Sequence, residues 1–105
     1  MKVMVRSIMK AVPGKMAEAM ELNEKHMAIA SRYGMPPMKG YRPFVGGEFF
    51  HTIIFEAEWN SLAAMEAFFD KMFSDPEMQA LMPKWDALLE SHEVELYIPM
   101  PSGTV

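Results

Sequence analysis

The sequence contains no cysteine. Disulfide bonds and thiolate metal sites are therefore excluded, and we expect a cytoplasmic protein. No apolar run approaches the roughly 20 residues that a membrane-spanning helix needs. The N-terminus also lacks the charged segment followed by an apolar one that marks a signal peptide. We therefore expect no contact with a membrane.

Strong positive charge is also missing. The formal net charge is -4 and the basic residues are scattered, which argues against a nucleic-acid partner. The three histidines, His26, His51 and His92, lie far apart, and no pair has the His-x-x-x-His spacing of a metal site. Phosphate-binding loops, nucleophile elbows and dinucleotide fingerprints are absent as well, so we expect neither a metal nor a cofactor.

Apolar residues, in contrast, are abundant. They make up 50% of a chain of 105 residues, which is the size of one domain. A small domain has little interior, so we expect part of this apolar surface to be buried against another subunit. The 13 methionines suit either an adaptable ligand surface or a soft-metal site. Core filling is the favoured interpretation, because Met16, Met20 and Met27 fall at helical spacing.

The hydrophobic pattern predicts four strands and three helical segments. Strands are expected over residues 2–11, 39–45, 48–58 and 93–98, and helices over 15–33, 62–73 and from Asp75 to before Ser91. Gly46-Gly47 is expected to form a hairpin turn, and Pro83 to kink or split the last helix. The order β-α-β-β-α-β is the ferredoxin-like arrangement of an α+β domain with an antiparallel sheet. We expect one domain over 1–99, a split of the second helical region near Ser74–Pro76, and a loose tail over 100–105.

Four short segments resemble the dimeric α/β-barrel superfamily. They are Val12-Pro13-Gly14-Lys15, Glu58-Trp59-Asn60-Ser61, the pair Phe68-Phe69, and Phe73-Ser74-Asp75-Pro76 before the final strand. The superfamily includes antibiotic-biosynthesis monooxygenases, NIPSNAP-like proteins, EthD-like proteins and haem-degrading monooxygenases. The resemblance implies a homodimer whose two sheets face each other as a barrel, which would account for the apolar content.

The resemblance does not extend to haem degradation. Those enzymes carry an Asn in the first strand, a Trp in the second helix and a haem-ligating His after it. Ser7, Lys71 and Leu81 stand roughly at these positions in this chain. The cofactorless quinone-forming monooxygenases line a pocket between sheet and helices with aromatic and amide side chains. This chain has aromatic residues there, without a diagnostic set.

Strand alternation gives a map of candidate site residues. Val94, Leu96 and Ile98 are expected to face the helices, together with Ser7 on the first strand and His51 on the central one. His26 points toward the same layer from the first helix. We predict His51 as catalytic base or proton relay, with His26, Ser7 and Tyr41 shaping a substrate pocket. The alternative is that each histidine is partly buried and hydrogen-bonded locally. His92 is expected at the surface or at a helix C-terminus.

The opposite face of the sheet is expected to meet the partner subunit. It carries a mixed set of polar side chains: Arg6, Thr52, Glu56, Glu95 and Tyr97. Either the arginine recognises an anionic ligand or the group forms an ion-pair network, and the network is favoured. Trp59 and Trp85 are expected to anchor the core.

Two classes of function remain open. One is a small enzyme or binding protein for an apolar or aromatic metabolite, with a cofactorless monooxygenase as the specific form. The other is a non-catalytic assembly or ligand-sensing module whose cavity is filled by Met and Phe side chains. An open cavity of a few hundred Å³ favours the first and a packed interior favours the second.

Overall fold

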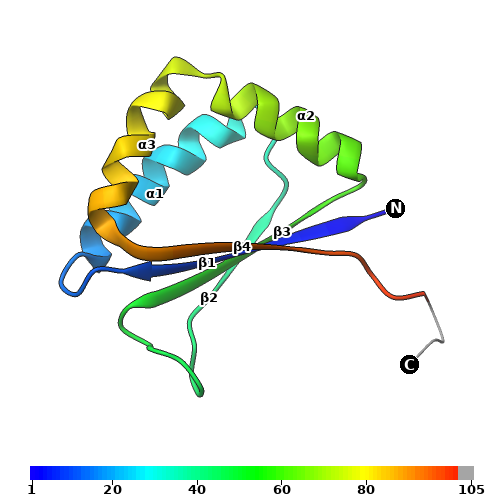
Figure 1. Ribbon diagram of the computed structural model, residues 1–105. Coiled ribbons are helices and arrows are strands. Elements are labelled where there is room, and N and C mark those ends of the chain that lie inside the picture. The colour runs from blue at the N-terminus through cyan, green and yellow to red at the C-terminus, as the bar shows by residue number, and fades with distance from the viewer. Residues whose placement is uncertain (102–105) are drawn as a thin grey trace.

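A four-stranded antiparallel sheet carries three helices on one of its faces (Figure 1). The computed structural model describes residues 1–101, so residues 102–105 of the predicted tail lie outside the described part. The elements are β1 (Val3–Ala11), α1 (Met16–Ser31), β2 (Met38–Tyr41), β3 (Thr52–Trp59), α2 (Leu62–Phe73), α3 (Pro76–Leu88) and β4 (Leu89–Tyr97). The strand order β2-β3-β1-β4 confirms the ferredoxin-like α+β prediction.

Side chains near the helix ends explain where α2 and α3 begin. The Ser61 hydroxyl accepts a hydrogen bond from the amide of Ala64 and caps α2. Asp75 caps α3 by accepting from the amide of Glu77, and Pro76 follows it at the first helical position. The predicted break near Ser74–Pro76 is therefore confirmed.

Asp75 also joins two helices. Its carboxylate accepts a hydrogen bond from the Tyr33 hydroxyl at 2.5 Å, just beyond the end of α1. Arg32, next to Tyr33, pairs with Glu77 at 3.1 Å in the first turn of α3. The Tyr33 hydroxyl lowers the pKa of Asp75 below its usual value. These contacts hold the C-terminal end of α1 against the N-terminal end of α3.

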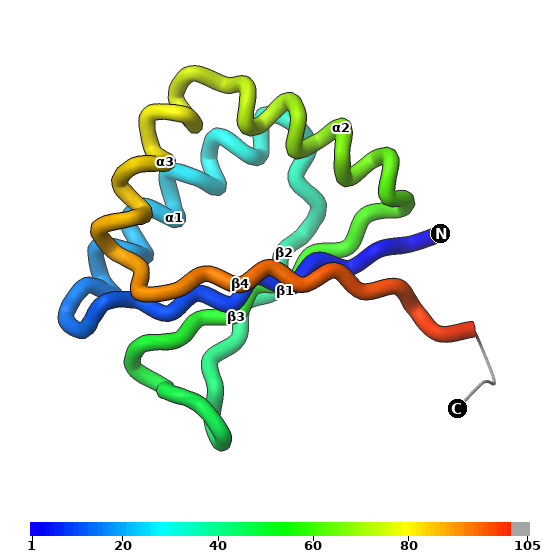
Figure 2. Tube along the Cα trace, in the orientation of Figure 1, coloured from blue at the N-terminus to red at the C-terminus, as the bar shows by residue number. Residues whose placement is uncertain are grey.

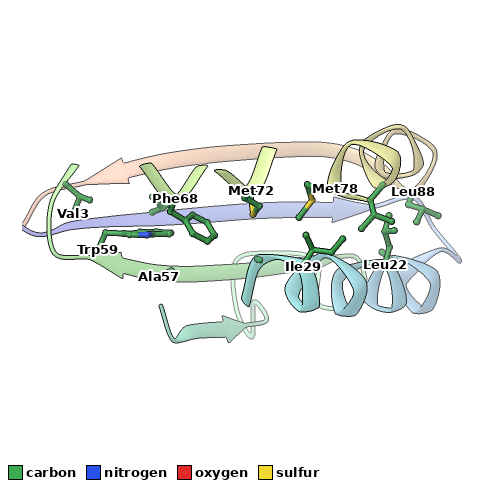
Figure 3. Close-up of a cluster of buried hydrophobic side chains, with 13 residues drawn as sticks. Val3, Leu22, Ile29, Ala57, Trp59, Phe68, Met72, Met78 and Leu88 are labelled. Atoms are coloured by element: carbon green, nitrogen blue, oxygen red, sulfur yellow. The ribbon is translucent and has the colours of Figure 1, made fainter. Parts of the chain in front are cut away.

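The core lies between the sheet and the helices (Figure 3). β1 and β3 contribute Val3, Val5, Ala57 and Trp59. The helices contribute most of the rest, and the sulfur-containing side chains among them fill space as expected. The helical members are Ala19, Leu22, Ile29, Ala30, Phe68, Met72, Met78, Leu81 and Leu88.

The connection between β2 and β3 differs from the prediction. β2 ends at Tyr41 and β3 begins at Thr52, so residues 42–51 form a long loop rather than a tight hairpin at Gly46-Gly47. The Glu48 carbonyl accepts from the amides of both His51 and Thr52, which closes a turn where a strand was expected. The loop projects away from the helices (Figure 2). Phe44 and Phe50 are largely exposed on it.

Pro83 does not split the last helix. α3 runs from Pro76 to Leu88 with the proline inside it. Proline removes one backbone hydrogen bond, but Met78, Leu81 and Leu88 are buried on both sides of it. Their burial keeps the segment helical. Within residues 1–101, no helix has the length and apolar character needed to cross a membrane.

Candidate functional site

A cavity of about 730 Å³ lies between the helical layer and the sheet. Such a volume is typical of sites for drug-sized molecules. Strand side chains form its floor and all three helices contribute to its walls. Six methionines contribute to its lining: Met9, Met27, Met35, Met38, Met72 and Met82.

The floor of the cavity holds a hydroxyl–imidazole pair. The register of β1 and β4 sets Ser7 opposite Val94 and Met9 opposite His92, so Ser7 and His92 share the helix-facing side. Ser7 Oγ and His92 Nε2 are hydrogen-bonded at 2.5 Å. Burial lowers the pKa of His92 below its usual value, which favours the neutral imidazole.

A second imidazole enters the cavity from α1. Burial lowers the pKa of His26, and the nearby His92 lowers it further. The rings of His26 and Trp85 meet edge to face with their centroids 6.2 Å apart. Within residues 1–101, His26 Nδ1 and Trp85 Nε1 are buried without a hydrogen-bond partner. Buried polar atoms are normally satisfied, so these two are suited to contact a bound molecule.

The other end of the cavity is aromatic. Trp59 packs against Phe69 with ring centroids 5.5 Å apart, and Phe69 stacks on Phe73 at 5.7 Å. Phe55 adds a further ring from β3. This end offers broad apolar faces, with the indole nitrogen of Trp59 as an additional buried atom that has no partner among the described residues.

Two of the four predicted site residues, Ser7 and His26, line the cavity, while His51 and Tyr41 do not. His51 was expected on a strand facing the helices, but it lies in the loop before β3. Tyr41 pairs with Ile54 and so belongs to the face of the sheet away from the helices. These positions do not test the roles that were predicted for the four residues, so those roles stay predictions.

His92 is the cavity residue that the sequence interpretation missed. The sequence pattern predicts a final strand that begins at Glu93, which would leave His92 at a helix–strand junction. β4 begins at Leu89, so His92 lies well inside it. The signal was present, since His92 continues the alternation of Val94 and Leu96 by one step toward the N-terminus.

The face away from the helices carries the predicted polar group. The Arg6 guanidinium donates to Glu56 at 2.9 Å and lies over the Tyr97 ring, 5.1 Å from its centroid. The Tyr97 hydroxyl donates to Glu95 at 2.7 Å. The structure thus shows one ion pair and one hydrogen bond among the residues for which an ion-pair network was the favoured interpretation.

Among residues 1–101, no three His, Cys, Asp or Glu side chains are grouped so that they could hold a metal ion.

The sequence profile of the NIPSNAP family matches residues 8–103. The chain belongs to the NIPSNAP family. A search of curated proteins gives no match. The NIPSNAP assignment agrees with the fold, because solved members of this family superpose on nearly the whole chain.

Three solved structures illustrate the likeness. A NIPSNAP family protein from Agrobacterium tumefaciens has a TM-score of 0.79 and 22% identity over 97% of this chain and 89% of its own. A NIPSNAP domain protein from Burkholderia xenovorans has a TM-score of 0.78 and 19% identity over 97% of each chain. SnoaB, a cofactor-independent oxygenase from Streptomyces nogalater, has a TM-score of 0.71 and 15% identity over 99% of this chain and 98% of its own. At these identities the structural likeness establishes the fold.

Proposed function

We propose that this NIPSNAP chain binds an apolar or aromatic metabolite in the cavity and removes a proton from it through Ser7 and His92. The observation that carries the proposal is the hydroxyl–imidazole hydrogen bond on the floor of a cavity that is otherwise mainly apolar. A general base must be unprotonated and within hydrogen-bonding reach of its partner. The lowered pKa of His92 meets the first condition at neutral pH.

The proposed step is a two-proton relay. The Ser7 hydroxyl gives its proton to His92 Nε2 and takes one from a phenol or enol of the ligand, leaving a neutral serine, an imidazolium and a phenolate or enolate. The apolar surroundings strengthen the electrostatic attraction between the two charged products. His26 and Trp85 then hold the ligand oxygen with their unpartnered ring nitrogens. Substrates with an acidic O–H next to a flat apolar body fit this arrangement.

A phenolate or enolate is electron-rich enough to react with O2 without a protein cofactor. Oxygenation is therefore the specific reaction that we propose to follow proton removal. The likeness to SnoaB supports this choice at the level of a shared scaffold, since one scaffold can carry several activities.

The competing function is a binding or assembly module without chemistry. A cavity filled by Met and Phe side chains was the feature expected for it. An open volume of about 730 Å³ supports ligand binding instead. A sensing module would bind the same metabolite in the same cavity. It would differ from the enzyme only because its Ser7–His92 pair would not remove a proton from the ligand.

The test uses 2-hydroxyanthraquinone, whose absorbance moves to longer wavelength when its phenol loses a proton. The wild-type protein should bind it and shift the absorbance at a pH where the free compound is protonated. His92→Gln and Ser7→Ala should retain binding while reducing the shift at least tenfold. His51→Ala is the matched control, because this residue lies outside the cavity. Binding with an unshifted spectrum in the wild type would favour the sensing module, and absence of binding would reject both functions.

We also propose that two copies pair through the sheet face away from the helices. The apolar side chains Met4, Ile8 and Ile54 alternate there with Arg6 and Glu56. Such a mixed surface is typical of an interface between subunits. Pairing of two sheets on these faces would give the barrel that the resemblance implies.

A further inference from the structure

The cavity lining is unusual in its charge. Among the described residues 1–101, none that lines it is a lysine or an arginine. Asp86 contributes a carboxylate to its walls, whereas the carboxylate of Glu56 pairs with Arg6 on the opposite face of the sheet. A cavity with this composition has no permanent positive charge to balance an anion.

Polar and apolar side chains occupy different ends of the cavity. His92 lies opposite Met9 and bonds to Ser7, while α1 and α3 bring His26 and Trp85 together nearby. The aromatic end begins where Val5 pairs with Ala57, beside Trp59. Four residue steps separate Val5 from Met9, which is about 14 Å along an antiparallel strand. The site is therefore elongated and polar at one end.

We infer that the ligand enters as an uncharged, elongated molecule, with its hydrogen-bonding group at the His92 end and its apolar body against Trp59 and Phe69. This inference rests on the proposed function, because it specifies the ligand of the same cavity. The class includes neutral phenols, enols and hydroxyquinones about three fused rings long, and it excludes carboxylates of the same shape.

The exclusion of carboxylates follows from desolvation. An anion transferred from water into an apolar cavity loses its hydration, and it is tolerated only where a positive charge or several donors replace the water. Here desolvation lowers the pKa of both imidazoles, which favours their neutral forms, and Asp86 adds repulsion at the polar end. A neutral hydroxyl needs only the hydrogen bonds that Ser7, His26 and Trp85 can provide.

The first experiment compares two ligands of matched shape by titration calorimetry at neutral pH. The probes are 2-hydroxyanthraquinone and anthraquinone-2-carboxylate. The hydroxyl compound should bind at least tenfold more tightly than the carboxylate. Equal or tighter binding of the carboxylate would overturn the inference and leave the cavity as a binding site. Failure of both compounds to bind would overturn the proposed function together with the inference.

The second experiment tests which end holds the polar group. Asp86 and Phe73 both line the cavity and both are exposed, so a lysine can replace either without burying its charge. Asp86→Lys should improve carboxylate binding at least fivefold, because it adds a cation at the His92 end. Phe73→Lys should leave carboxylate binding weak. Glu66→Lys, on α2 outside the cavity, controls for net charge. Rescue by Phe73→Lys in place of Asp86→Lys would show the opposite orientation and overturn the inference.

Discussion

The histidines show how far single residues can be interpreted without a structure. Of the three histidines, the sequence pattern favours His51, because the central strand predicted over 48–58 includes it. The structure brings His26 and His92 into one cavity and leaves His51 in a loop. The identity and the polarity of these residues could be read from the sequence. Their grouping could not, because it depends on a register set by β1 and its neighbours on both sides.

Partial desolvation of two imidazoles predicts a specific pH dependence of stability. Both pKa values are lowered in the folded state, so the unfolded chain binds more protons as the pH falls through 6.5. The free energy of unfolding should therefore keep its full value at neutral pH and should decrease as the pH is lowered from about 7 to about 5. Urea titrations across this range measure it.

His26→Gln is the matching variant for this experiment. It removes one of the two imidazoles whose pKa is lowered, so the decline toward acid pH should become shallower. An unchanged slope in the variant would contradict the assignment of the effect to His26. Asp75 does not interfere, because its lowered pKa removes stability only below about 3.8, well outside the range measured.

Most elements were predictable because their sequences carry two kinds of signal at once. α2 combines an apolar stripe with the cap at Ser61, and its predicted bounds match the structure. The loop 42–51 was not predictable, because Phe49, Phe50 and Ile53 continue an apolar run that looks like strand. The Glu48 carbonyl accepts hydrogen bonds from two backbone amides, and the turn that they close makes β3 begin later than the side chains indicate.

The cap at the start of α2 gives a prediction at this scale. Ser61→Ala removes the acceptor for the Ala64 amide and should lower the free energy of unfolding by about 1 kcal/mol. Ser61→Asp keeps an acceptor at the same position and should retain most of the stability. Chemical denaturation of the three proteins measures the difference. Equal losses in both variants would show that the hydroxyl contributes by packing rather than by capping.

The topology as a whole was predictable from the order of the elements along the chain. Assembly into a dimer cannot be observed in the structure of a single chain. The three helices cover one face of the sheet and leave the other open (Figure 1). Large side chains remain exposed on this open face, including Tyr41 and Tyr97. A surface of this composition favours association with a second copy.

Pairing through the open face has a direct test. The double variant Ile8→Asp and Ile54→Asp adds two like charges to each copy of the proposed interface, and a paired interface would bring four together. The wild type should sediment as a dimer and the variant as a monomer. Glu21→Lys on the exposed side of α1 is the control and should remain dimeric. Sedimentation of the wild type as a monomer at micromolar concentration would contradict the proposal.

β4 has a single hydrogen-bonded neighbour, β1, among the described strands. His92 lies on this strand, and its partner Ser7 lies on the neighbour. A strand held along only one side is free to fray from its open side, and pairing with any further strand would restrain it. The pair that we propose for proton removal therefore depends on what lies against the free edge of β4.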